Sequence, residues 1–243
     1  MAEITAALVK ALRDKTDAGM MDCKKALNEC NGDMEAAVKY LREKGIAKAA
    51  AKADRDAKEG VIRAAVAPCG CSGIILELNC ETDFCAKGDK FQGLVNDVAK
   101  ALMDSKASTL EEALQVAMPE GTTEEYIKAM CSSIGENMAL RKFARLTVDG
   151  SGAVVSYIHM GGKIGVLIEV NCETDFVANG EPFGNFVKGV AAVVAKENPA
   201  DVDALMGCPW VTGKGTVKDA KDELFLAIRE NMNVRRFARI ADG

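Results

Sequence analysis

The sequence predicts an α+β protein in which an N-terminal three-helix module precedes two tandem core subdomains, each a small antiparallel sheet with helices. Three observations predict this fold: helical spacing of apolar residues near the N-terminus, an Ala- and Lys-rich run after it, and a motif pattern that occurs twice. The 243 residues leave room for several domains. We therefore expect a three-helix domain over 1–45, a helical linker over 46–60, a first core subdomain over 61–150 and a second over 151–243.

The first 45 residues read as three short helices. Apolar side chains spaced by three and four residues mark the buried face of each helix. These are Leu8, Val9 and Leu12; Cys23, Ala26, Leu27 and Cys30; and Met34, Ala37, Val38 and Leu41. Asp33 is expected to cap the third helix and Gly45 to end it. The run IAKAAAKADRDAKEG that follows is helix-prone and poor in large apolar residues, so it predicts a semi-rigid helical linker.

The rest of the chain contains one unit twice. Each copy predicts a hairpin that ends in Asn-Cys-Glu-Thr-Asp-Phe, then helices, then a final strand, LRKFARL or VRRFARI. Subtracting the number of Asp83 from that of Asp175 gives 92, and Asn137 and Asn231 of the IGEN and IREN runs differ by 94. This nearly constant spacing indicates a duplicated domain of roughly a hundred residues. We expect the two copies to pack about a pseudo-twofold axis within a monomer.

Composition excludes several classes of protein. The net charge is -5, and the 28% of charged residues mix both signs, which argues against a protein that wraps nucleic acid. The N-terminus lacks the pattern of a signal peptide, and no stretch approaches the length of a membrane span. We therefore expect a cytoplasmic protein that binds neither nucleic acid directly nor a membrane.

The cysteines predict neither a disulfide framework nor a metal site. There are 9 cysteines, an odd number, and without an export signal they are expected to stay reduced. Cys69-Gly70-Cys71, followed by Cys80 and Cys85, does not have the spacing of a four-ligand zinc site, so we expect no metal and no cofactor. An enzyme that used Cys80 or Cys85 as a nucleophile would need a nearby base, and His159 is the only histidine.

Several long motifs occur in one order along the chain: TDAGMMDCKKAL, NCETDFCAKGDKF, IGEN, YIHMGGKIGVL and NCETDFVANGEPF. In these motifs, and over nearly its whole length, the chain resembles the elongation factor Ts family. The resemblance implies an N-terminal ubiquitin-associated-like domain and a core of two related subdomains. It also implies a guanine-nucleotide exchange factor, not an enzyme. Such a factor binds the GTPase domain of elongation factor Tu·GDP, makes a second contact through its core subdomains, and promotes GDP release by disturbing the magnesium and phosphate site, so that GTP can reload.

The same resemblance assigns the exchange role to Asp83 and Phe84, together with Thr82. An aromatic side chain on a rigid turn can enter a partner's pocket at a low cost in ordering. From the residues alone, Thr82 or Asp83 could instead cap the next helix while Phe84 packs beneath it. A possible second motif consists of Thr174, Asp175, Phe176 and Val177. The first copy is preferred because it follows the helical module.

Further partner contacts are implied at Cys23 and Lys24 in the helical module, and at Ile134, Gly135 and His159 in the core. The alternatives are a solvated helix face for the lysine and a hydrogen-bonded hairpin residue for the histidine.

Two departures from the family pattern are visible. Cys85 stands where the family usually has valine, and the second unit resembles a first core subdomain more closely than the divergent second one. Trp210 has two readings, an anchor of the second core or a partner contact.

The rival function is a non-catalytic ubiquitin-associated-like scaffold, in which the first 45 residues bind a partner. It leaves the repeated Thr-Asp-Phe motif unexplained.

Overall fold

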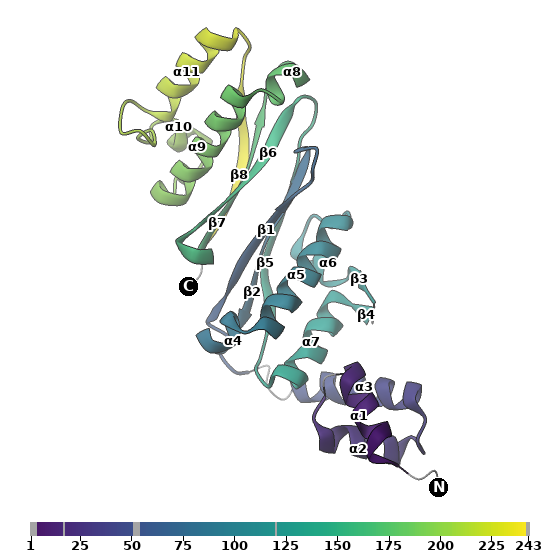
Figure 1. The fold of residues 1–243 in the computed structure, drawn as a ribbon. Helices are drawn as coiled ribbons and strands as arrows, with labels where there is room; N and C mark the ends of the chain where they lie inside the picture. The colour runs from purple at the N-terminus through teal and green to yellow at the C-terminus, as the bar shows by residue number, and fades with distance from the viewer. Residues whose placement is uncertain (1–3, 17, 51–53, 120, 242–243) are drawn as a thin grey trace.

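The computed structural model describes residues 4–16, 18–50, 54–119 and 121–241. The three-helix module lies at one end of the molecule, the first α+β unit in the middle and the second unit at the other end (Figure 1). Each unit is a small antiparallel sheet covered by helices, which confirms the predicted fold class. Among the described residues, no helix is both long enough and apolar enough to cross a membrane.

The N-terminal module has the helices α1 (Ala6–Thr16), α2 (Met20–Glu29) and α3 (Met34–Ala50). Its core contains Val9, Leu12, Cys23, Ala26, Leu27 and Ala37, all on the faces that the spacing predicted. The Asp33 carboxylate accepts a hydrogen bond from the backbone N–H of Ala36 at 3.0 Å, which confirms the predicted cap.

The prediction that Gly45 ends the third helix is wrong, because α3 continues to Ala50. Gly45 is buried against α7 (Thr123–Ile134) of the first unit, where a Cβ atom would lie 3.4 Å from Cβ of Ser132. The glycine thus serves close packing between helices. The predicted helical linker is helical only as far as Ala50; residues 51–53 lie outside the described residues, 54–58 are irregular, and a strand begins at Glu59.

Over its described residues, the first unit contains one main three-stranded sheet and four helices. The strands are β1 (Glu59–Val66), β2 (Ser72–Cys80) and β5 (Ala139–Thr147), antiparallel in the order β1-β2-β5. The helices are α4 (Asp83–Lys87), α5 (Asp89–Asp104), α6 (Leu110–Leu114) and α7. A short pair, β3 (Ala117–Met118) and β4 (Gly121–Thr122), was not predicted. The predicted capping box of Thr109 and Glu112 is present at the start of α6.

The second unit repeats this plan. Its strands are β6 (Gly152–His159), β7 (Ile164–Asn171) and β8 (Asn233–Ala241), with a 3-10 turn, η1 (Met160–Gly162), in the hairpin. Its helices are α8 (Asp175–Ala178), α9 (Glu181–Glu197), α10 (Val202–Met206) and α11 (Val217–Ile228). The Trp210 ring stacks on Phe186 with the ring centroids 5.7 Å apart. Of the two readings of Trp210, this packing favours the core anchor.

The two sheets face each other between the outer helix layers (Figure 1). The central strand β2 is therefore buried on both faces: Ile74, Leu76 and Leu78 pack under the helices, whereas Ile75 packs against the other sheet. Six buried residues form the core between the sheets: Ile62, Ile75, Leu146, Val154, Leu167 and Ile240. They are three equivalent pairs, because the second three follow the first three by 92, 92 and 94 residues.

The contacts between the units are reciprocal. A Cβ atom on Gly73 would lie 3.0 Å from Leu167 Cδ1 of the second unit, and a Cβ on Gly165 would lie 2.5 Å from Ile62 Cγ2 of the first. Gly165 follows Gly73 by 92 residues and is its equivalent in the second unit. In each unit, the glycine at this position makes room for a side chain of the other unit. Reciprocal contacts of equivalent residues are the signature of twofold packing. The pseudo-twofold arrangement predicted from the repeat is confirmed.

Ion pairs repeat the same symmetry at the edge of this core. Buried Glu77 pairs with Lys142 at 2.8 Å, and Lys142 also donates to the backbone carbonyl of Ala241 in the second unit at 3.1 Å. In the second unit, buried Glu169 pairs with Arg236 at 2.6 Å. Each buried carboxylate thus has a cationic partner, as burial of charge requires.

The prediction that every cysteine stays reduced is wrong for one pair. Cys69 and Cys71 form a disulfide in the β1–β2 hairpin turn. Gly70 between them has a φ of 68°, and this tight left-handed turn brings the two side chains together.

Candidate functional site

The Thr-Asp-Phe motif forms the turn between β2 and α4. Thr82 caps the helix, because its Oγ1 accepts a hydrogen bond from the backbone N–H of Cys85 at 3.1 Å. Phe84, in the first turn of this helix, is 86% exposed. Of the two readings of the motif, the cap is therefore present, but Phe84 points into solvent and does not pack beneath the helix.

Glu136 holds this turn from behind. Its carboxylate accepts hydrogen bonds from the backbone N–H groups of Glu81 at 3.0 Å and Thr82 at 3.1 Å, and from the Thr82 hydroxyl at 2.7 Å. Three bonds to one carboxylate fix the turn to the segment that follows α7. Ile134 is the last residue of α7, and Gly135, with a φ of 95°, ends the helix and leads into that segment. The structure therefore brings both predicted contact residues to the base of the turn.

Glu136 was not singled out in the sequence, although a signal was present. Its counterpart Glu230 follows at a spacing of 94, in the repeated Glu-Asn of IGEN and IREN. Glu230 makes equivalent bonds to Thr174, to the backbone N–H at 3.1 Å and to the hydroxyl at 2.7 Å. Because a glutamate occurs at the equivalent position of both units, the repeat indicates that Glu136 and Glu230 have the same structural role.

Asp83 is exposed and pairs with Lys87 at 2.8 Å, one helical turn further along. The hydrogen bond and the charge of Lys87 hold the pKa of the Asp83 carboxyl below its ordinary value. At neutral pH the turn therefore presents a carboxylate beside an exposed aromatic ring.

The second motif has nearly the same geometry. Thr174 caps α8 by accepting from the backbone N–H of Val177 at 3.3 Å, and Phe176 is 89% exposed. Asp175 differs from its counterpart because it accepts a hydrogen bond from the Ser151 hydroxyl at 2.8 Å. Apart from the partner of the aspartate, the two turns have the same local arrangement.

His159 lies at the end of β6, in the hairpin of the second unit. Its ring stacks on Tyr157, with Nδ1 3.3 Å from the tyrosine hydroxyl, so the predicted structural hydrogen bond is present. The adjoining turn η1 contacts β1, the strand of the first unit that α4 also contacts. Met160 in this turn is 63% exposed. The hairpin of the second unit thus lies on the same strand as the Phe84 turn of the first.

The helical module places its predicted contact residues differently. Cys23 is fully buried in the three-helix core, and burial raises the pKa of its thiol. The neighbouring Lys24 is exposed. Met21, which the sequence analysis did not select, is 77% exposed on the same helix. The surface available on this helix therefore combines a lysine with a large apolar side chain, and Cys23 supports it from below.

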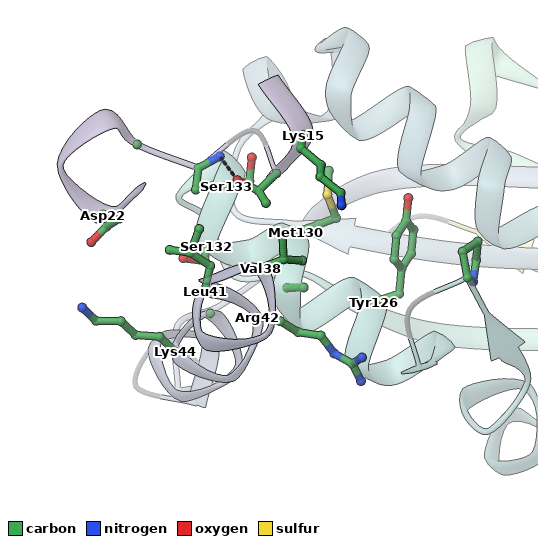
Figure 2. A pocket seen from close by; sticks show the side chains of 16 residues that line it. Lys15, Asp22, Val38, Leu41, Arg42, Lys44, Tyr126, Met130, Ser132 and Ser133 are labelled. Carbon is green, nitrogen blue, oxygen red and sulfur yellow. Dashed lines mark hydrogen bonds between the residues drawn. The ribbon is translucent and has the colours of Figure 1, made fainter. Parts of the chain in front are cut away.

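The module is docked on α7 of the first unit. A cavity of about 380 Å³ remains at this junction, and Figure 2 shows Lys15, Arg42 and Tyr126 among its lining side chains. Arg42 bridges the junction by pairing with Glu125 at 2.7 Å. Because Gly45 meets α7 near Ser132, the module lies within one helical turn of the segment that carries Gly135.

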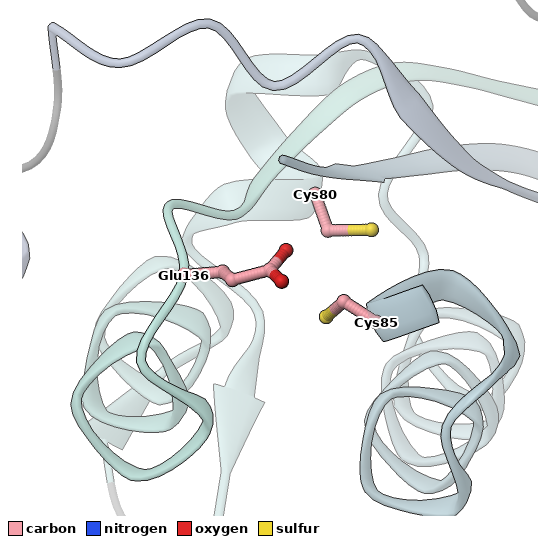
Figure 3. A group of neighbouring side chains, drawn as sticks. All are labelled: Cys80, Cys85 and Glu136. Atoms are coloured by element: carbon pink, nitrogen blue, oxygen red, sulfur yellow. The ribbon is translucent and has the colours of Figure 1, made fainter. Parts of the chain in front are cut away.

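Within the described part of the chain, one cluster could hold a metal ion: Cys80, Cys85 and Glu136, behind the Phe84 turn (Figure 3).

These features define a class of protein: a duplicated α+β core with an N-terminal three-helix module and exposed aromatic residues on clamped turns. The family model described as "Elongation factor TS" matches residues 81–173 and 173–243. The chain belongs to the elongation factor Ts family.

Two relatives are named "Elongation factor Ts". The protein of Trichlorobacter lovleyi is 47% identical over 201 residues, which cover 81% of this chain and 64% of the relative. That of Nitratiruptor sp. is 45% identical over 200 residues, which cover 82% and 65%. The chain thus spans slightly less than two thirds of the length of these relatives.

Proposed function

We propose that the chain is a guanine-nucleotide exchange factor that binds elongation factor Tu·GDP, promotes GDP release and allows GTP to reload. It acts as a monomer in the cytoplasm, where translation takes place, and makes or breaks no covalent bond. Family membership supports this function, and one observation carries its mechanism: Phe84 is 86% exposed on a turn that a carboxylate holds by three hydrogen bonds.

The mechanism needs only a difference in affinity. A GTPase that binds its nucleotide with nanomolar affinity holds it by roughly 12 kcal/mol. A factor that binds the nucleotide-free GTPase more tightly than the loaded form weakens nucleotide binding by the same ratio. The factor therefore has no need to touch the nucleotide.

Phe84 is the wedge in this proposal. An exposed aromatic ring gains from burial in a partner's pocket, and the clamped turn lowers the ordering cost of binding. Asp83 assists as a carboxylate next to the ring, held in place by Lys87. Entry of the ring shifts partner elements that carry the magnesium and phosphate contacts. Thr82 and Glu136 act as positioning residues.

We assign the exchange role to the first motif rather than the second because of its surroundings. The helical module docks on α7, whose end at Gly135 leads to the clamp of the Phe84 turn. The hairpin with His159 contacts the strand that α4 contacts. Ile134, Gly135 and His159 thus supply the contact of the core with the partner, whereas the Phe176 turn lies at the end of the described structure that is far from the three-helix module (Figure 1).

The helical module grips the GTPase domain through α2. Lys24 supplies a positive charge and Met21 an adaptable apolar contact, whereas Cys23 holds the helix in position. Lys24→Ala and Met21→Ala should therefore weaken complex formation without unfolding the module.

A binding cycle tests the proposal. The affinity of the chain for elongation factor Tu is measured by titration calorimetry in the nucleotide-free and GDP-loaded states. Tighter binding to the nucleotide-free state is expected, and excess GDP should dissociate that complex. Equal affinity for both states would remove the thermodynamic basis of exchange and leave the scaffold function in its place.

A further inference from the structure

Three metal-ligating groups converge behind the Phe84 turn. The Sγ atoms of Cys80 and Cys85 and a carboxylate oxygen of Glu136 all lie within 4.8 Å of one another. They come from the end of β2, the first turn of α4 and the segment after α7, and Figure 3 shows the Glu136 carboxylate directed toward the two cysteines. Three distant parts of the first unit therefore meet at one point.

The donor set fits zinc. Two thiolates and one carboxylate match the sulfur and oxygen ligands of Zn²⁺, which takes four ligands in tetrahedral geometry. Two sulfur atoms on one zinc at about 2.3 Å lie about 3.8 Å apart. The two Sγ atoms, at most 4.8 Å apart, thus need to close by no more than about 1 Å.

The three ligand groups differ in how deeply they are buried. Cys80 is 0% and Cys85 is 6% exposed, and both belong to the apolar core of the first unit. Glu136 is half-buried and is the least buried of the three ligands. A water that reaches the metal beside Glu136 would supply the fourth ligand.

The neighbouring groups would orient the ligands. Glu136 is fixed by its bonds to the Phe84 turn. Such outer contacts are a regular part of metal sites. The hydrogen bond that the Cys80 thiol donates to the backbone carbonyl of Thr82 at 3.3 Å is given up when the thiol loses its proton to bind the metal.

The second unit provides a comparison within the chain. Cys172 and Glu230 occupy the positions of Cys80 and Glu136, and Cys172 Sγ donates to the Thr174 carbonyl at 3.3 Å, as Cys80 does to Thr82. The third position, however, is Val177. One substitution separates the unit that has the cluster from the unit that lacks it.

We propose that Cys80, Cys85 and Glu136 form a zinc site that ties together the strand, the helix and the clamp of the Phe84 turn. Zn²⁺ binds two thiolates and one carboxylate and releases two protons to solvent. The spacing of cysteines did not reveal this site, because Glu136 follows Cys85 by 51 residues. Metal binding is independent of exchange activity, so the two proposals can fail separately.

Cobalt titration tests the site. The full chain, with Cys69→Ser and Cys71→Ser to remove the exposed cysteine pair, is kept reduced with a phosphine and titrated with Co²⁺, followed by competition with Zn²⁺. One equivalent of Co²⁺ should produce sulfur-to-cobalt charge-transfer absorption and the visible bands of a tetrahedral ion, and Zn²⁺ should abolish both. Glu136→Gln should weaken binding at least about tenfold, the lower end of the loss expected even for an outer contact.

The second unit supplies matched variants. Cys85→Val, which installs the residue of the second unit, should abolish the signal while the circular dichroism stays unchanged. Val177→Cys should raise the stoichiometry to two. Equal cobalt binding by wild type and Cys85→Val, or a spectrum without charge transfer, would overturn the proposal. So would a thiol count two short in a separate sample that is denatured without any reductant, which would indicate a Cys80–Cys85 disulfide. If Cys85→Val does not fold, Cys85→Ala takes its place.

Discussion

Substitution of Gly165 by alanine should destabilise the core, because the two sheets leave no room for a side chain there. A Cβ atom at Gly165 would lie 2.5 Å from Cγ2 of Ile62 and 2.7 Å from Cδ1 of Ile75, both in the other unit. These side chains are buried, and Cγ2 of a β-branched residue cannot move without a change of χ1. Overpacking of this kind costs about 1–3 kcal/mol.

The loss is measured by urea unfolding, with thermal unfolding in parallel. For a chain of this size, each kcal/mol corresponds to about 2–4 °C in Tm. Gly93→Ala is the control, because a Cβ at this helical position meets nothing within 4 Å. It should stabilise the protein by about 0.5–1 kcal/mol, since alanine favours a helix over glycine.

A double-mutant cycle isolates the contact between the units. Ile62→Ala removes the Cγ2 atom that blocks the new Cβ, whereas Ile62→Val retains it. Gly165→Ala should therefore cost less in the Ile62→Ala background, with a coupling of about 0.5–3 kcal/mol, and the same amount as in wild type in the Ile62→Val background. A Gly165→Ala protein as stable as Gly93→Ala would show that the sheets do not pack as described.

Four other variants test the clamp, the local backbone and the Asp83–Lys87 ion pair. Glu136→Ala and Glu230→Ala should each cost about 1–3 kcal/mol in urea unfolding through lost hydrogen bonds. Only Glu136→Ala should slow GDP release, and equal slowing by both would contradict the assignment of the first turn. Arg229→Gly should stabilise the chain by about 0.5–1 kcal/mol, because Arg229 ends α11 at a φ of 60° where glycine is unstrained; a loss of stability would contradict this reading. Lys87→Ala should return the pKa of Asp83 toward its ordinary 3.8, as carbon NMR of the carboxyl would show. Pairing with Lys87 lowers the pKa of Asp83 in the folded protein. The stability that the pair contributes is therefore present above the pKa of Asp83 in the unfolded chain and is lost as the pH falls through its pKa in the folded protein. An unchanged pKa of Asp83 in Lys87→Ala would exclude the pair as the cause of the shift.

Much of the fold follows from the sequence, because local spacing and repetition determine it. The apolar stripe of α5, from Phe91 to Leu102, is buried as its helical period predicts. The constant spacing between repeats predicted two equivalent units and their pseudo-twofold packing. These features can be predicted from the sequence because the helical period depends on residues close together in the chain, and the repeat is found by comparing the chain with itself.

The failures concern contacts between distant segments. Gly45 resembles a helix end but lies inside α3, because it packs on α7 some 87 residues later, the difference between Ser132 and Gly45. The Glu136 clamp joins residues 54 apart, Glu136 and Thr82, and no local pattern indicates this bond. The sequence also did not determine whether Phe84 is exposed, because a helix capped by Thr82 can carry the ring either in solvent or packed beneath the helix.

The most direct test of the account is the rate of GDP release from elongation factor Tu. Fluorescent GDP is displaced in a stopped-flow instrument by wild type, Phe84→Ala, Phe176→Ala and the double variant, each checked for an unchanged free energy of unfolding. Both side chains are nearly fully exposed, at 86% and 89%, so neither change should affect folding. The account predicts fast release by wild type and by Phe176→Ala, and slow release by Phe84→Ala. Fast release by Phe84→Ala and slow release by Phe176→Ala would move the site to the second unit, and no acceleration by wild type would contradict the exchange function itself.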